Sequence, residues 1–237
     1  MNRLDEAWKA YIDYTGGREF RPGLYLARYL ELSPEYPMLI YKHGDESLIL
    51  LSDFLWEGRE ALEAYRQGMD VTEVLGLFLE GVSYLPEAVC MLALEGNPKT
   101  PQKTPAGTIR PLKPLADSVA MGVLKRACSK EERTAGSVSL QDVWPTGFFA
   151  EGKLVAAASA WLWGDRLADL GVLTHGGYRR QGCGAAVVSA VAVRAIAEGR
   201  IPFYRCDAAN TASFALAKSL GFAEIARGEG ATVRYPE

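Results

Sequence analysis

The sequence has few of the residues on which metal and redox proteins depend. Among 237 residues it has four cysteines and two histidines. The cysteines form no Cys-x-x-Cys pair and no Cys/His cluster, since they lie far apart at Cys90, Cys128, Cys183 and Cys206. The spacing predicts no metal site, and reduced, mostly buried thiols of this kind are typical of a cytoplasmic protein.

The sequence also has no long apolar run and no excess of basic residues. Its best apolar stretch, 154–163, is far shorter than the ~20 residues that a membrane-spanning helix needs. The N-terminal residues 1–6 have no apolar signal core. A formal net charge of −3 argues against nucleic acid as the main partner, because duplex-binding proteins usually carry a basic surface. We therefore expect a cytoplasmic protein with no membrane and no nucleic-acid partner.

A polar segment rich in proline divides the chain into two parts. It spans residues 97–107, contains Pro98, Pro101 and Pro105, and has no apolar periodicity. This composition predicts a linker between an N-terminal α/β domain at 1–96, of unknown role, and a second domain at 108–237. A long surface loop inside one domain is the alternative.

Hydrophobic periodicity and turn residues predict the elements of the first part. Residues 43–45 are typical of a hairpin turn, and Asp70 is a typical helix N-cap. The expected helices are 4–14, 55–69 and 71–79, and the expected strands are 38–41, 47–51 and 88–94.

The second part alternates strands and helices more regularly. The expected helices are 114–128, 187–197 and 211–220. The expected strands are 109–112, 147–150, 154–163, 167–174 and 201–206, followed by a hairpin of 222–227 and 231–235. Helices that cross between strands predict an α/β (α+β) fold with a mixed central sheet covered on both faces.

Residues 178–185, called here the glycine turn, lie between an expected strand and an expected buried helix. Gly182 and Gly184 let the main chain approach an anion, and the amides that begin the helix can bind a diphosphate. Arginines beside these glycines add positive charge. A tight strand-to-helix corner with no ligand is the alternative.

Two local patterns in the second part resemble those of the GNAT acyltransferase superfamily. Arg179, Gly182 and Gly184 match its Gln/Arg-x-x-Gly-x-Gly/Ala turn, and 210–222 is similar to its closing helix and Gly-Phe exit. Gly176 stands where the family usually has proline. The resemblance covers about 108–237 and implies a mostly antiparallel GNAT sheet flanked by helices.

Within that superfamily, residues 169–175 and 202–207 resemble a two-domain bacterial subgroup that includes zwittermicin-resistance-type acetyltransferases. This subgroup resemblance does not fix the acceptor.

The resemblance implies acetyl-CoA or another acyl-CoA as co-substrate. Main-chain amides of the glycine turn would bind its diphosphate, and its pantetheine arm would pair with the strand at 172–174 as an added strand does. That strand edge must then splay from 203–206, and Gly171 either forms a bulge there or simply weakens the strand. The expected cofactor-binding residues are Val172, Leu173, Thr174, Arg179, Arg180, Gln181, Gly182, Cys183, Gly184, Ala185, Asn210 and Ser213.

Acyl transfer also needs a proton donor for the leaving thiolate. Many GNAT enzymes carry a tyrosine seven residues after the capping asparagine, and Ala217 stands at that position. Ser213 is the catalytic candidate in its place; a water could also donate, the thiolate could leave unaided, or Ser213 is only a helix-start residue.

A general base must take a proton from the amine, whose ordinary pKa is about 10.4. Asp169 is the catalytic candidate, and its alternative interpretation is an edge charge or a partner for Arg166. His175, Tyr204 and Asp207 are the other candidates considered.

The sequence thus predicts an acyl-CoA-dependent N-acetyltransferase that acts on an amine of a small molecule, such as an antibiotic, or of a peptide. The rival prediction is a non-catalytic acyl-CoA binding or sensing protein that has lost its acid. A homodimer is possible. The N-terminal part would shape the acceptor pocket, mediate dimerisation, or be a decayed half that resembles the second part.

Overall fold

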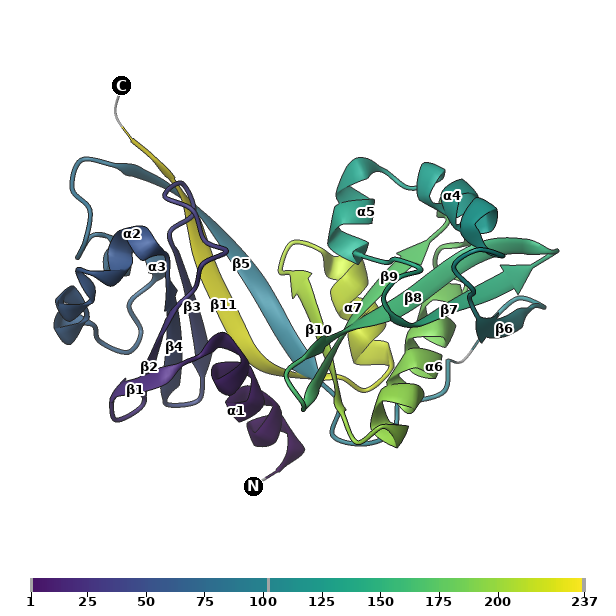
Figure 1. Ribbon diagram of the computed structural model, residues 1–237, viewed down its shortest axis with the longest axis horizontal. Helices are drawn as coiled ribbons and strands as arrows, with labels where there is room; N and C mark the ends of the chain where they lie inside the picture. Colours follow the sequence, from purple (N-terminus) through teal and green to yellow (C-terminus); the bar gives the residue numbers. More distant parts are fainter. Residues whose placement is uncertain (1, 102, 236–237) are drawn as a thin grey trace. The chain divides into compact units, whose positions relative to one another are not determined.

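The computed structural model describes residues 2–101 and 103–235. The chain divides into two compact units, which we describe separately (Figure 1). No helix in the described ranges is long and apolar enough to cross a membrane. Unit 1 contains the residues up to 7, 92–206 and 210–223, and unit 2 contains 8–91, 207–209 and the residues from 224 onward.

Unit 2 is built on a sheet of strand order β1-β2-β4-β3-β11-β5. Strands β2 and β4 are parallel, whereas the β1–β2, β3–β4 and β3–β11 pairs are antiparallel. The elements, some of which begin or end in unit 1, are α1 (Arg3–Thr15), β1 (Arg18–Arg21), β2 (Leu24–Arg28), β3 (Met38–His43), β4 (Glu46–Leu51), α2 (Asp53–Trp56), η1 (Arg59–Ala64), α3 (Val71–Leu75), β5 (Ser83–Ala93) and β11 (Ala223–Arg234).

The hairpin expected around 43–45 is confirmed. Strands β3 and β4 pair in a regular antiparallel register from Met38↔Leu51 to His43↔Glu46, and Gly44 has the positive φ of 55° that such a turn requires. The first helix is confirmed as α1, whereas β1 and β2 carry no strong periodicity and were not predicted.

The long helix expected at 55–69 is wrong. The chain forms the single turn α2 and the 3₁₀ helix η1 instead, and Gly68, with φ of 100°, leaves helical geometry. Leu62 and Tyr65 are nevertheless buried on one face, which explains the helical appearance of the pattern. The next helix is shorter than expected and ends at Leu75, although Asp70 makes the expected N-cap, a full capping box with Glu73.

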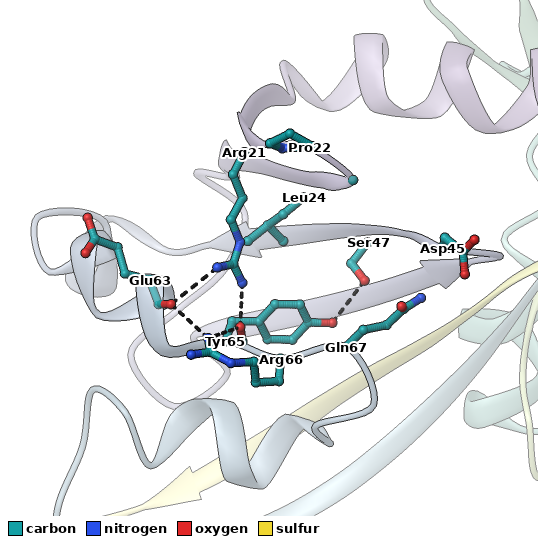
Figure 2. Close-up of a pocket in the computed structure, with 10 residues that line it drawn as sticks. Arg21, Pro22, Leu24, Asp45, Ser47, Glu63, Tyr65, Arg66 and Gln67 are labelled. Carbon is teal, nitrogen blue, oxygen red and sulfur yellow. Dashed lines mark hydrogen bonds between the residues drawn. The ribbon is translucent and has the colours of Figure 1, made fainter.

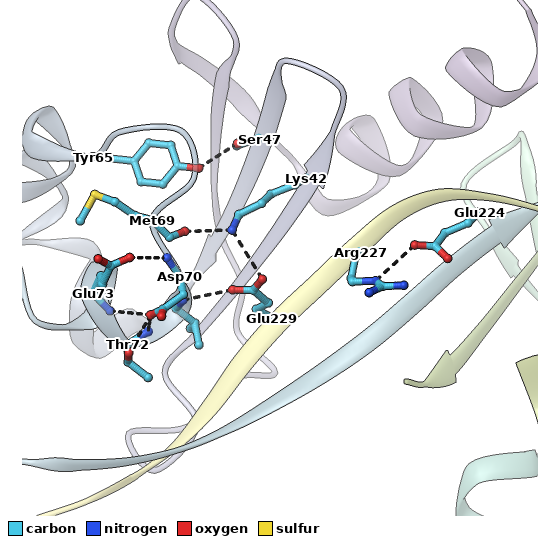
Figure 3. A network of polar contacts seen from close by, with 11 residues as sticks. Lys42, Ser47, Tyr65, Met69, Asp70, Thr72, Glu73, Glu224, Arg227 and Glu229 are labelled. Atoms are coloured by element: carbon cyan, nitrogen blue, oxygen red, sulfur yellow. Dashed lines mark hydrogen bonds and ion pairs between the residues drawn. The ribbon is translucent and has the colours of Figure 1, made fainter. Parts of the chain in front are cut away.

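Polar contacts hold this irregular segment against the sheet (Figure 3). The Lys42 ammonium donates to the carbonyl of Met69 at 2.9 Å and lies 3.5 Å from the Glu229 carboxylate. That carboxylate also accepts the amide of Val71 at 3.2 Å. Lys42 of β3 and Glu229 of β11 thus hold the segment between η1 and α3 against the sheet.

The final hairpin expected at 222–235 is wrong as well, because β11 is one strand that pairs with β3. Its two central glycines do not turn the chain. A Cβ at Gly228 would overlap the ring of Tyr41, and one at Gly230 would overlap the hydroxyl of Tyr36. The two glycines make room for tyrosine side chains. In the sequence alone, glycines of this kind look like the glycines of a turn.

Unit 1 is built on the strand order β10-β9-β8-β7-β6, in which only β9 and β10 are parallel. Its elements are β6 (Thr108–Pro111), α4 (Ser118–Arg126), α5 (Lys130–Gly136), β7 (Val143–Ala150), β8 (Lys153–Trp163), β9 (Leu167–Thr174), η2 (Gly176–Tyr178), α6 (Cys183–Ala197), β10 (Ile201–Asp207) and α7 (Thr211–Ser219). The predicted class, a mixed and mainly antiparallel sheet flanked by helices, is confirmed; α5 was not predicted.

Helices cover both faces of this sheet. Leu173 lies in one core cluster with residues of α4, including Leu124. On the other face, the start of α6 at Gly184 lies close to the side chains of Val172 and Thr174. Because side chains alternate along a strand, these contacts place α4 and α6 on opposite faces of β9.

The predicted linker at 97–107 is not a free spacer, although Gln102 lies outside the described residues. The amide of Lys99 donates to the carbonyl of Leu220 at 2.8 Å, and the Lys103 carbonyl lies against Gly182. Both contacts are within unit 1. The units also differ from the predicted domains 1–96 and 108–237, because most of β11 belongs to unit 2.

Candidate functional site

The glycine turn has the main-chain geometry of an anion-binding site. Arg180 and Gly182 have positive φ values of 60° and 82°, and α6 begins directly after them. The first three amides of a helix have no acceptor within it, and no side chain caps this one. Successive amides in such a turn converge on one point, so the turn can bind a diphosphate.

The turn's polar side chains have different partners. Arg179 forms an ion pair with Glu132 of α5, at 2.7 Å between Nη2 and Oε1, so its guanidinium anchors the turn. Gln181 donates to the carbonyl of Gly177 at 2.9 Å. Arg180 is exposed, and its side chain has no hydrogen-bond or ion-pair partner among the residues that the structure describes. Of the predicted side chains, Arg180 is therefore the one free to meet a phosphate.

Residues behind the turn pack closely. A Cβ at Gly184 would lie 2.7 Å from the hydroxyl of Thr174, so this glycine lets α6 approach β9. The Cys183 thiol is buried, and burial raises its pKa. A thiol held protonated is a poor nucleophile, so Cys183 contributes its amide and its packing.

Strands β9 and β10 separate where the sequence predicts an open edge. Their paired register runs from Leu167↔Ile201 to Asp169↔Phe203 and goes no further. The remainder of β9 contains Val172, Leu173 and Thr174, the residues expected beside a pantetheine arm. The separation supports that prediction.

Gly171 does not form the bulge that was one of its two interpretations. It stands opposite Ser159 in an unbroken β8–β9 register. A Cβ there would overlap the carbonyl oxygen of Gly136, at the end of α5. A Cβ at Gly136 would in turn lie 2.5 Å from the carbonyl of Val172. The two glycines let the main chains of α5 and β9 touch.

We expect Gly171→Ala to lower the free energy of unfolding by about 1–3 kcal/mol, because the added methyl group overpacks a main-chain contact. The measurement is urea unfolding followed by circular dichroism. Gly176→Ala is the matched control, since a Cβ at Gly176 meets nothing within 4 Å. Equal stability of the two variants would contradict the proposed role of Gly171.

Asp169 lies where the two strands part. Its carboxylate is 3.0 Å from the Arg205 guanidinium, which is itself 4.2 Å above the ring of Trp163. Burial raises the pKa of Asp169 although Arg205 acts in the opposite direction. The alternative pairing with Arg166 is wrong, because Arg166 pairs with Glu6 at 2.7 Å.

The hydroxyl groups of Tyr204 and Ser213 form a pair, 2.8 Å apart. Tyr204 comes from β10 and is 2 % exposed, whereas Ser213 lies in the first turn of α7 and is partly exposed. Asn210 caps this helix by accepting the Ser213 amide at 3.0 Å. The Tyr204 phenol thus reaches the start of α7 from strand β10. Ala217, where many GNAT enzymes have tyrosine, is fully buried.

The sequence does not reveal this pair, because its two hydroxyl groups come from a strand and a helix that only the fold brings together. Burial raises the pKa of Tyr204 to about 12, so the phenol stays protonated near neutral pH and can act only as a donor. His175 accepts the Gly177 amide through Nδ1, and Asp207 accepts the Ala209 amide. Both side chains therefore stabilise local turns of the main chain.

Comparison with known proteins agrees with the fold. Residues 146–227 match the family model described as GNAT acetyltransferase. A GNAT-family acetyltransferase structure from Novosphingobium aromaticivorans is similar, with 22 % identity, a TM-score of 0.50, and coverage of 67 % of this chain and 69 % of that chain. A GCN5-related N-acetyltransferase from Sphaerobacter thermophilus aligns with a TM-score of 0.53 at 16 % identity, over 70 % of this chain and 57 % of that chain. No curated protein matches the chain.

About two thirds of the chain thus has a fold similar to that of these GNAT-family structures. The family model places the similarity to GNAT acetyltransferases at residues 146–227, in the C-terminal part of the chain.

Proposed function

We propose that the protein transfers an acetyl group from acetyl-CoA to an amine of a small molecule or a peptide. The observation that carries this proposal is the glycine turn beside a strand that separates from its neighbour after Asp169. The amides of 183–185 and the Arg180 side chain would hold the diphosphate. The open edge of β9 at 172–174 would hold the pantetheine arm. These residues fit a diphosphate and an extended arm in both charge and main-chain geometry.

Acetyl-CoA would supply the thioester carbonyl that the amine attacks. The C–N bond forms, the C–S bond breaks, and the amine proton passes to a base. Asp169 is the proposed base, because its raised pKa favours proton uptake and it lies at the strand separation. The Ser213 hydroxyl would give a proton to the departing sulfur, and Tyr204 would replace that proton through their 2.8 Å contact. Water would then return a proton to Tyr204, and Asp169 would release its own proton to water.

The alternative function is acyl-CoA binding without catalysis. One observation favours it: the position at which many GNAT enzymes have tyrosine is occupied by the buried Ala217. The Tyr204–Ser213 pair weakens this alternative, because it brings a phenol to the same helix by another route. The zwittermicin-resistance subgroup, the cytoplasmic location and a homodimer stay predictions.

The test is release of free thiol from acetyl-CoA with a panel of small-molecule and peptide amines. We expect turnover with at least one amine and none without an acceptor. Saturable acetyl-CoA binding without turnover across the panel would instead support the sensing protein. Absence of binding would contradict both functions.

A further inference from the structure

Unit 2 contains a cavity of about 380 Å³ whose walls come from three separate segments (Figure 2). This volume lies within the range of roughly 300–1,000 Å³ that is usual for small-molecule sites. The lining residues are Arg21, Pro22, Gly23, Leu24, Asp45, Ser47, Glu63, Tyr65, Arg66 and Gln67. We call this cavity the Arg21–Arg66 pocket.

Two arginine side chains in this pocket donate hydrogen bonds to the same two carbonyl oxygens. Arg21 donates to the carbonyl oxygen of Glu63 at 3.3 Å and also to that of Tyr65. Arg66 donates through Nη1 to the same two oxygens, at 3.0 Å and 2.8 Å. Shared acceptors therefore hold two positive charges close together, an arrangement that costs electrostatic energy unless an anion balances it.

No carboxylate forms an ion pair with either arginine among the residues that the structure describes. The Glu63 side chain points away from the two guanidinium groups, and Asp45 lies at the opposite end of the pocket (Figure 2). A guanidinium has five N–H donors, and each of these two makes only two hydrogen bonds. Most of their donors are thus available to a ligand.

The rest of the pocket is polar and ordered. The hydroxyls of Ser47 and Tyr65 are 2.9 Å apart and both residues are buried. The Gln67 amide donates to the carbonyl of Gly44 at 3.0 Å, which ties the segment after η1 to the β3–β4 turn. These contacts hold the polar side chains of the pocket in place before a ligand binds. Binding therefore costs less conformational entropy.

We propose that the Arg21–Arg66 pocket binds a small organic anion through a carboxylate or phosphate group. Two oxygens of such a group match the fork of a guanidinium, and a second arginine adds charge. The site is independent of acyl transfer, so it is tested without acetyl-CoA and its failure would leave the proposed function untouched.

The experiment titrates the full chain with inorganic phosphate and, separately, with malonate, and follows amide shifts by NMR. We expect saturable binding of at least one probe, with shifts at Ser47 and Gln67. Arg66→Gln and Arg21→Gln should each weaken binding about tenfold or more, a loss of roughly 1.4 kcal/mol. Arg18→Gln is the matched control: it removes the same charge from β1, outside the pocket, and should change affinity less than about twofold.

The preferred probe distinguishes a phosphate ligand from a carboxylate ligand. The proposal is overturned if neither probe saturates, or if the Arg66→Gln variant binds as well as the Arg18→Gln control. Should Arg21→Gln fail to fold, because its guanidinium also holds two carbonyls, Arg66→Gln alone decides the question.

Discussion

Gly182→Ala should reduce the affinity for acetyl-CoA about 100-fold, equivalent to roughly 3 kcal/mol, because charge-assisted hydrogen bonds from the turn would be lost. The φ of 82° at this position is unfavourable for any residue with a side chain. A Cβ would also overlap the Lys103 carbonyl, so the turn or the segment beside it must move. The measurement is calorimetric titration with acetyl-CoA.

Gly221→Ala separates loss of the site from general strain. Gly221 has a similar φ of 92°, but a Cβ there meets only the Lys99 side chain, at 3.5 Å or more. Both variants should be less stable than the parent protein, whereas only Gly182→Ala should bind acetyl-CoA poorly. Parent-like affinity in Gly182→Ala would remove the glycine turn from cofactor binding.

Tyr204→Phe should lower kcat by about 100-fold or more while the KM for acetyl-CoA changes little, since a well-placed proton donor contributes on this scale. The substitution keeps the ring, whose centroid is 5.7 Å from that of Phe222, and removes only the hydroxyl. Ser213→Ala should have a similar effect, because the same pair of hydroxyls is broken. Steady-state kinetics with a responsive amine give both constants.

The pH profile distinguishes proton donation from a packing role. With a pKa raised to about 12, the Tyr204 phenol remains protonated at lower pH, so it should cause no loss of kcat on the alkaline side below that value. Tyr84→Phe is the control, since this tyrosine lies on β5 in unit 2, outside both the hydroxyl pair and the glycine turn. A kcat for Tyr204→Phe within about twofold of this control would exclude Tyr204 from catalysis.

Strong local patterns determined how much of the fold could be predicted. Strand β9 has the predicted bounds, and β8 and α7 differ from theirs by one residue, because their apolar periods end at turn or cap residues. The broken segment at 55–69 and the single strand β11 could not be predicted. Their conformations depend on partners distant in sequence, such as Tyr36 and Tyr41 beside the glycines of β11.

The glycine turn was predictable as a strand-to-helix turn for the same reason, whereas the side-chain contacts of the candidate site were not. Gly182 has the positive φ that its glycine allows, whereas Gly184 lies inside α6. Ion pairs and hydroxyl pairs join separate elements, so no spacing along the chain reveals that Arg179 meets Glu132 or that Tyr204 meets Ser213. Long-range contacts of this kind decide which side chains are available for chemistry.

The place of β11 in the sheet of unit 2 has a consequence for biosynthesis. This strand lies between β3 and β5, yet it comes from the last part of the sequence. A ribosome releases the early strands long before it has made their central neighbour. Strands β3 and β5 therefore lack the hydrogen bonds of their central neighbour until residue 234 has been synthesised. Chaperone protection during translation would matter most in that interval.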